Sequence, residues 1–160
     1  KTQLLELNSL SKSFNMAGWR IGMLCGNANL IKNVVQVKTN MDSGMFYPIQ
    51  KGAATALKST SKWNQELNQE YAHRRQLIWK LCDQLNLKYD QKSTGLFVWS
   101  KITNDQNEEV LSDLLLHTYN MFVTPGSIFG DQGKGYLRFS LCVKPTDIQT
   151  CIERTQKISL

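Results

Sequence analysis

Two cations stand eight positions apart in residues 9–22, SLSKSFNMAGWRIG, and this stretch contains no acidic residue. Lys12 has serines on both sides, and Arg20 lies between a tryptophan and an isoleucine. A neutral lysine amine can form a Schiff base with an aldehyde. A guanidinium beside hydroxyl side chains is suited to bind a phosphate. The stretch therefore predicts a site for a molecule that offers both an aldehyde and an anion.

The residues around Arg20 favour the same chemistry. Gly18 and Gly22 lack side chains, so we expect them to let backbone approach closely on both sides of the arginine. Pyridoxal 5′-phosphate carries both an aldehyde and a phosphate, so the residue types indicate this cofactor. For Lys12 taken alone, an ordinary surface lysine is the alternative.

The pattern Ser-x-Ser-Lys followed by Arg-x-Gly in residues 9–22 resembles the lysine segment of class I/II aminotransferases, pyridoxal-phosphate enzymes of fold type I. The resemblance extends through essentially the whole chain and implies transfer of an amino group from an amino acid to a 2-oxo acid. It implies that Lys12 is the catalytic residue, which forms the Schiff base and moves the proton of the substrate α-carbon. The cofactor-binding residues that it implies are Ser9, Ser11, Lys12 and Arg20.

A further arginine lies downstream in residues 124–140, TPGSIFGDQGKGYLRFS. Alternation predicts a strand whose apolar side chains face helices and whose opposite face carries Arg138. The residues predicted to face the helices are Leu137, Phe139, Leu141 and Val143. A structural ion pair is one possible role for Arg138. The segment also resembles the family's C-terminal region, which implies that Arg138 binds the substrate α-carboxylate as a bidentate pair.

The resemblance covers only part of such an enzyme. The family's N-terminal half supplies a phosphate-binding loop, an aromatic residue that stacks on the cofactor ring and an aspartate that pairs with the pyridine nitrogen. This sequence has no match to them, so we expect a C-terminal portion that is inactive as an isolated chain. A pyridoxal-phosphate lyase or decarboxylase of the same fold and a cofactor-free structural domain are the alternatives.

Residues 40–53, NMDSGMFYPIQKGA, resemble the stretch that reaches towards the partner's site in the family's dimers. The resemblance implies a homodimer for the full-length enzyme. It places Ser43, Gly44 or Tyr47 near a neighbouring cofactor, whereas a helix-capping loop is the alternative.

The sequence does not identify the substrate side chain. Aromatic residues in GLFVW, residues 95–99, and in GSIFG, residues 126–130, fit two roles. They could line an aromatic or aliphatic pocket, or they could belong to the core.

Ser9 and Lys12 also satisfy the S-x-x-K motif of serine β-lactamases and penicillin-binding proteins, in which Ser9 would be the nucleophile. Those enzymes need S-D-N and K-T-G elements as well. The nearest matches, Ser-Asp-Leu at Ser112 and Lys-Thr-Asn at Lys38, satisfy neither. The sequence therefore disfavours this class.

Composition narrows the remaining function classes. The chain has 160 residues, of which 41% are hydrophobic and 20% charged, so we expect a packed core. The net charge is +6, but the cations are dispersed, which disfavours nucleic-acid binding.

The four cysteines show no zinc spacing, and we expect no metal. Cys142 and Cys151 are predicted to be core thiols, and His73 and His117 to be solvated or core residues.

The sequence shows no signal peptide and no apolar run long enough to span a membrane. Cysteines that are predicted to be free thiols are typical of proteins in a reducing compartment. We therefore expect a cytoplasmic protein that binds amino-acid and 2-oxo-acid substrates.

Hydrophobic periodicity predicts an α/β fold, the end of the large pyridoxal-phosphate-binding domain followed by the small C-terminal domain. The boundary gives residues 1–61 to the large-domain remnant and 62–160 to the small domain with its long connecting helix. The predicted strands are 3–9, 20–27, 95–102, 121–126 and 135–143, and the predicted helices 29–39, 47–59, 62–86, 107–120 and one opening at Pro145. Arg74 interrupts the apolar stripe of the long helix, by snorkelling or by finding a partner.

Overall fold

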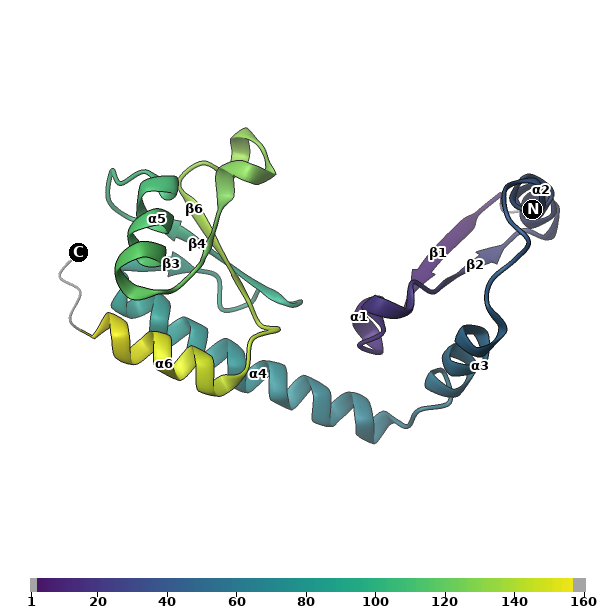
Figure 1. Cartoon of the computed structure of the whole chain (residues 1–160), viewed down its shortest axis with the longest axis horizontal. Coiled ribbons are helices and arrows are strands. Elements are labelled where there is room, and N and C mark those ends of the chain that lie inside the picture. The colour runs from purple at the N-terminus through teal and green to yellow at the C-terminus, as the bar shows by residue number, and fades with distance from the viewer. Residues whose placement is uncertain (1–2, 157–160) are drawn as a thin grey trace. The chain divides into compact units, whose positions relative to one another are not determined.

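The computed structural model describes residues 3–156 and divides after Trp63 into two compact units, unit 1 and unit 2. Figure 1 labels the α-helices and every strand except β5. The elements of unit 1 are β1 (Leu5–Ser9), α1 (Leu10–Ser13), η1 (Ala17–Trp19), β2 (Gly22–Gly26), α2 (Ala28–Met41) and α3 (Tyr47–Ala56). They continue with α4 (Ser61–Gln84), β3 (Leu87–Tyr89), β4 (Phe97–Ile102), α5 (Glu108–Tyr119), β5 (Thr124–Pro125), η2 (Gly126–Phe129), η3 (Asp131–Gly133), β6 (Tyr136–Ser140) and α6 (Pro145–Thr155).

Unit 1 is built on an antiparallel pair of strands. β1 and β2 pair from Leu5 opposite Gly26 to Ser9 opposite Gly22, and α1 and η1 lie in the connection between them. A small core of Leu10, Met16, Ile21 and Ala53 holds that connection against α3. The position of α1 at the end of the strand pair therefore depends on buried Leu10.

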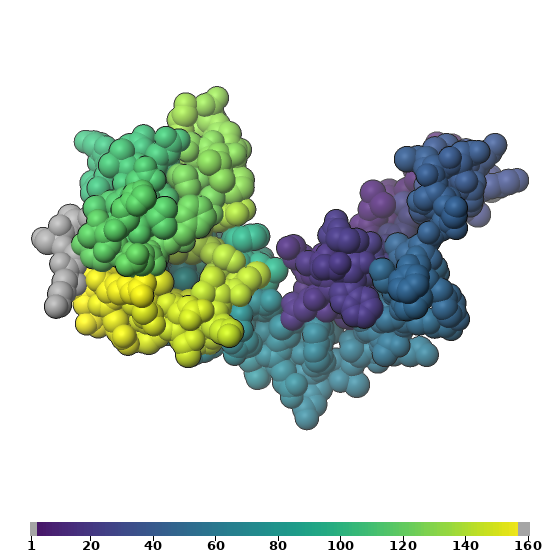
Figure 2. All heavy atoms as spheres, viewed as in Figure 1, coloured from purple at the N-terminus to yellow at the C-terminus, as the bar shows by residue number. Residues whose placement is uncertain are grey.

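Unit 2 is a two-layer α/β unit. Its antiparallel sheet has the order β3-β4-β6-β5, and α4, α5 and α6 supply the core against one face. Figure 2 shows the segment that contains η2 and η3 as a light-green lobe of unit 2. The opposite face of the sheet carries the alternate residues of β4 and β6, which remain partly exposed.

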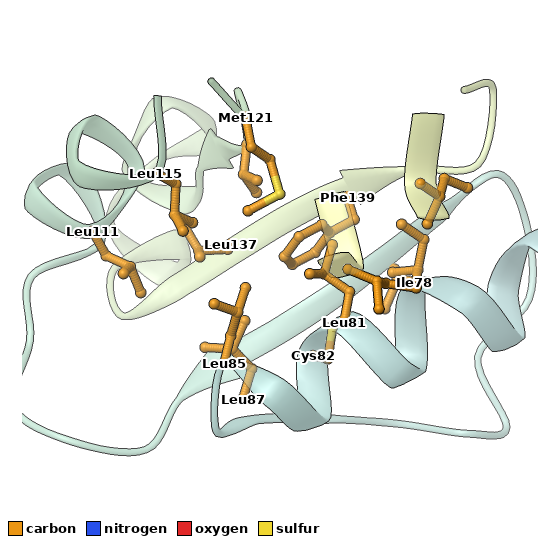
Figure 3. Packing of buried hydrophobic residues seen from close by; sticks show 14 of the residues in the cluster. Ile78, Leu81, Cys82, Leu85, Leu87, Leu111, Leu115, Met121, Leu137 and Phe139 are labelled. Carbon is orange, nitrogen blue, oxygen red and sulfur yellow. The ribbon is translucent and has the colours of Figure 1, made fainter. Parts of the chain in front are cut away.

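The core of unit 2 joins all three helices to the sheet. Figure 3 shows the part of this core in which side chains of α4 and α5 meet those of β6. Leu115 of α5 and Leu137 of β6 have no exposed surface. The C-terminal part of the predicted apolar stripe of the long helix is confirmed, since Ile78 and Leu81 of α4 lie in this core. Burial of these side chains supplies the main stabilisation of the unit.

Local signals set the ends of several helices. Asn107 caps α5, with its Oδ1 accepting from the N–H groups of Glu109 and Val110. Pro48 and Pro145 occupy first turns, where a missing N–H removes no helical bond. These caps confirm the predicted starts of α5, α3 and α6.

Three sequence expectations were wrong at the sheet and its edge. Strand β3 was not predicted, because its three residues are too few to show an alternation. Strand β6 ends at Ser140, so Val143 lies beyond it with 40% of its surface exposed instead of facing the helices. Cys142 is also exposed and is not a core thiol, whereas Cys151 is partly buried.

Arg74 finds partners rather than solvent. Its Nε donates to Glu70 Oε1 at 2.8 Å, and its Nη1 donates to the carbonyl of Leu141 at 3.1 Å. The interruption of the apolar stripe is therefore a polar contact between α4 and the end of β6.

We predict that Leu115→Ala lowers the free energy of unfolding by about 2–5 kcal/mol, because it leaves a cavity in a filled core. Urea denaturation of the chain measures the change. Leu116→Ala on the same helix is the matched control, since Leu116 is 38% exposed and should cost far less. Equal losses for the two variants would contradict the assigned core.

Candidate functional site

Lys12 lies on α1, immediately after β1. Ser9 is the N-cap of this short helix, and its Oγ accepts the N–H of Ser11 at 3.2 Å. Leu10 is 1% exposed and anchors the helix, whereas Lys12 in the last turn is exposed. The sequence thus folds into a strand, a cap and one helical turn that presents the lysine amine to the surface of unit 1.

Arg20 sits at the C-terminal end of η1 in the left-handed region, with φ 52° and ψ 46°. Its Nη1 donates to the carbonyl of Ala17 at 2.9 Å, which steadies the exposed side chain. A non-glycine residue in this region is uncommon and costs backbone energy. The tight connection between η1 and β2 imposes this backbone conformation on Arg20, whose guanidinium is also the candidate phosphate-binding group.

Ser9, Ser11 and Arg20 line one hollow of about 470 Å³ in unit 1. Lys38 of α2 lines it too, while Lys12 is not among the described residues that do so. Lys38 was missed at the sequence level, because nothing in a predicted amphipathic helix marks one lysine as facing a site. Its Nζ donates to Asp42 Oδ2 at 2.5 Å.

The two glycines beside Arg20 differ. A Cβ on Gly22 would lie 2.7 Å from the carbonyl oxygen of Asn8, so the close backbone approach expected there is confirmed. A Cβ on Gly18 would meet no described atom within 4 Å. The expectation of close approach on both sides was therefore wrong for Gly18.

Arg138 of β6 lies on the face of the sheet that is turned away from the helices, opposite Trp99 of β4. Its guanidinium carbon is 4.3 Å from the ring centre of Phe97 and 4.2 Å from that of Phe129. Among the described residues, no carboxylate pairs with Arg138. Contacts with two rings therefore hold the charge while leaving its hydrogen-bond donors without an acidic partner.

The aromatic residues of the two flagged segments gather around Arg138 and are not core. Trp99 lies 5.7 Å from Phe129 and 5.5 Å from Tyr136, measured between ring centres. Phe97, Trp99 and Phe129 keep 36–48% of their surface exposed. Arg138 also borders a cavity of about 280 Å³ with a mostly apolar lining. The structure thus places a cation within an accessible aromatic face.

The other polar candidates show no catalytic arrangement. His73 and His117 are exposed, and the described residues contain no group of three potential metal ligands. Burial raises the pKa of the Cys82 thiol to about 12, and this thiol contacts Ser100 in the core. Cys82 is therefore protonated at neutral pH and unsuited to be a nucleophile. None of the described helices has the length and apolar character needed to cross a membrane.

Residues 1–154 match the family model of aminotransferases of class I and II. The chain belongs to this family. It is 34% identical to the LL-diaminopimelate aminotransferase of Maridesulfovibrio salexigens over 99% of this chain and 41% of that protein. It is 35% identical to transaminase BacF of Bacillus subtilis over the full chain and 41% of BacF. The chain thus spans about two fifths of the length of the curated relatives it matches.

Solved structures show the same relationship and define the fold as that of fold-type-I aminotransferases. Substrate-bound BacF from Bacillus subtilis superposes with a TM-score of 0.87 at 35% identity, covering 98% of this chain and 40% of BacF. An aromatic aminotransferase from Pyrococcus horikoshii OT3 gives a TM-score of 0.83 at 29% identity, covering 94% and 41%. These proteins are aminotransferases, which gives no support to the lyase or decarboxylase alternative.

Proposed function

We propose that this chain is part of a pyridoxal-phosphate-dependent aminotransferase and carries its catalytic lysine, its phosphate ligands and its carboxylate-binding arginine. The observation that carries the proposal is the family match over residues 1–154, together with the exposed Lys12 amine on a helix whose cap, Ser9, lines the cationic hollow. The reaction moves an amino group from an amino acid to a 2-oxo acid.

The residues of the hollow fit a phosphate. Ser9 and Ser11 supply hydroxyl groups, Arg20 supplies a guanidinium and Lys38 an ammonium group. The described lining contains no carboxylate, although the Lys38 ammonium also pairs with Asp42, which is not part of the lining. Charge-assisted hydrogen bonds of this kind are among the strongest that proteins form. The donor set therefore suits the phosphate of the cofactor, with Lys12 providing the primary amine for its aldehyde.

Pyridoxal phosphate, when bound, supplies an electron sink for the electrons left on the substrate α-carbon. Lys12 Nζ would accept the proton of the substrate α-carbon as a general base and deliver it to the cofactor as a general acid, so that the proton moves between the two. Arg138 binds the substrate carboxylate and fixes its orientation, because a guanidinium matches a carboxylate with two parallel hydrogen bonds. Ser9, Ser11 and Arg20 hold the phosphate end throughout.

The wider assignments follow from the same proposal. We assign residues 1–61 to the large cofactor-binding domain and 62–160 to the small domain, which is supported by the division of the structure after Trp63. We also propose a homodimer in which residues 40–53 approach the partner's site; this stretch is mostly exposed. A cytoplasmic location is supported by the absence of disulfides among the four cysteines, which the structure describes as free.

The test is an assay of the native polypeptide that carries this sequence, with added pyridoxal phosphate. The amino donors should include LL-diaminopimelate and aromatic amino acids, which the names of the relatives suggest. We expect a keto product that appears only when a 2-oxo acid acceptor is present. Carbon dioxide or ammonia released without any acceptor would instead favour the decarboxylase or lyase alternative.

A further inference from the structure

The segment 126–135, which we name the Phe129 loop, connects β5 to β6 as a closed turn. A Cβ on Gly126 would collide with the carbonyl of Gly133, and a Cβ on Gly133 would collide with the carbonyl of Gly126. Inside the loop the Gly133 N–H donates to Gly130 O at 2.9 Å. The backbone at Gly126 and at Gly133 is therefore in contact, which closes the loop on itself.

The first turn of α5 fastens this loop at two points. Ser127 Oγ donates to Glu109 Oε1 at 2.8 Å, and the Gly135 N–H donates to Glu108 Oε2 at 3.0 Å. Glu108 is only 5% exposed, and backbone hydrogen bonds from its own N–H and from Gly135 lower the pKa of its carboxyl. Asn107 caps the same turn, with its Oδ1 accepting the N–H groups of Glu109 and Val110. The loop is thus attached near each of its ends.

The side chain of Phe129, within the Phe129 loop, contacts the guanidinium of Arg138. Phe129 lies 4.2 Å from the guanidinium carbon, and Phe97 on β4 contacts the same group at 4.3 Å. Phe97 is fixed by the sheet, whereas Phe129 depends on the loop. A cation held between two rings loses less freedom when it binds a carboxylate, because its orientation is already set. The position of Phe129 therefore bears on how Arg138 meets a substrate.

We propose that Ser127 and Glu109, together with Glu108, are positioning residues for Arg138. They hold the Phe129 loop so that its ring keeps the guanidinium oriented towards the substrate carboxylate. This inference rests on the proposed function, because it takes Arg138 as the carboxylate-binding residue. None of the three residues contacts the guanidinium, so each acts through Phe129.

The experiment measures kcat and KM for the amino donor, and the inhibition constant of butyrate as a competing monocarboxylate, with the native polypeptide loaded with pyridoxal phosphate. We expect Ser127→Ala and Glu109→Ala each to raise KM and the butyrate inhibition constant by about two- to tenfold, the range for one lost hydrogen bond. kcat should change much less. Phe129→Leu should raise both constants in the same direction, since it removes the ring that the two residues position.

Two variants control for general disturbance of the loop. Glu109→Gln keeps a carbonyl oxygen that can accept from Ser127 Oγ, so it should restore constants close to those of the wild type. Asp131→Asn breaks the exposed ion pair with Lys134 in the same loop, and it should leave butyrate inhibition unchanged. Melting temperatures of all variants show whether each one folds.

The outcomes separate this inference from the proposed function. If Arg138→Ala weakens butyrate inhibition while Ser127→Ala, Glu109→Ala and Phe129→Leu leave it unchanged, the positioning role is overturned and the function stands. If Arg138→Ala itself has no effect on butyrate, the assignment of Arg138 as the carboxylate ligand fails first. A loss in Asp131→Asn as large as in Ser127→Ala would also overturn the positioning role.

Discussion

Replacing Lys12 by alanine is expected to reduce transamination by the native polypeptide by about 10²- to 10⁴-fold or more, the range for loss of a positioned proton-transfer group. The expected loss is large because the same amine is proposed to bind the cofactor covalently. Lys12 is exposed on α1, and its removal leaves the buried anchor Leu10 intact. The protein should therefore stay folded and lose chemistry only.

One labelling measurement and two further variants test the role of Lys12. Borohydride reduction followed by peptide mass spectrometry should find the pyridoxal group on the peptide that contains Lys12 in the wild type. Lys12→Arg keeps a positive charge but lacks a primary amine, so it should fail as Lys12→Ala does. Lys32→Ala, an exposed lysine on α2, is the control and should keep full activity. A pyridoxal group attached to another lysine would refute the assignment.

The elements of this fold follow closely from the sequence because their periodicities are long and their caps are explicit. The stripe of α4 runs over many turns, so its pattern outweighs single exceptions such as Arg74. Asn107, Pro48 and Pro145 mark helix starts by chemistry that operates locally. Short strands behave differently: the three residues of β3 are too few to display a period, and of the predicted strand 121–126 only Thr124–Pro125 pair in the sheet as β5.

The same difference between local signals and tertiary contacts decides which candidate site residues could be predicted from the sequence. Residues that act from one contiguous segment, Ser9, Ser11 and Arg20, could be selected from their spacing, and the structure places them around one hollow. Lys38 and the partners of Arg138 could not, because they reach their places through tertiary contacts. The carboxylates that hold the Phe129 loop lie in the first turn of α5, where a negative charge is favourable in any helix, so their charge alone does not identify the loop as their partner. Their hydrogen bonds to Ser127 and Gly135 are a property of the folded unit.

Replacing Arg138 by alanine is expected to lower kcat/KM for the amino donor by about 10- to 150-fold. A charge-assisted hydrogen-bond pair contributes about 1.5–3 kcal/mol, and each 1.4 kcal/mol corresponds to about a tenfold change. Arg138 makes no ion pair with a described carboxylate, so its removal leaves no acid unpaired within the described part of unit 2. Folding should therefore be nearly unaffected.

Lysine at the same position separates charge from geometry. Arg138→Lys keeps the positive charge but loses the planar fork and its stacking between Phe97 and Phe129, so it should recover only part of the lost kcat/KM. The measurement is the initial rate over a range of amino-donor concentrations, with Lys101→Ala on neighbouring β4 as an exposed cationic control. If Arg138→Lys restored kcat/KM fully, the positive charge alone would be sufficient to bind the substrate carboxylate. In that case the aromatic contacts of Arg138 would serve the stability of unit 2 instead of substrate orientation.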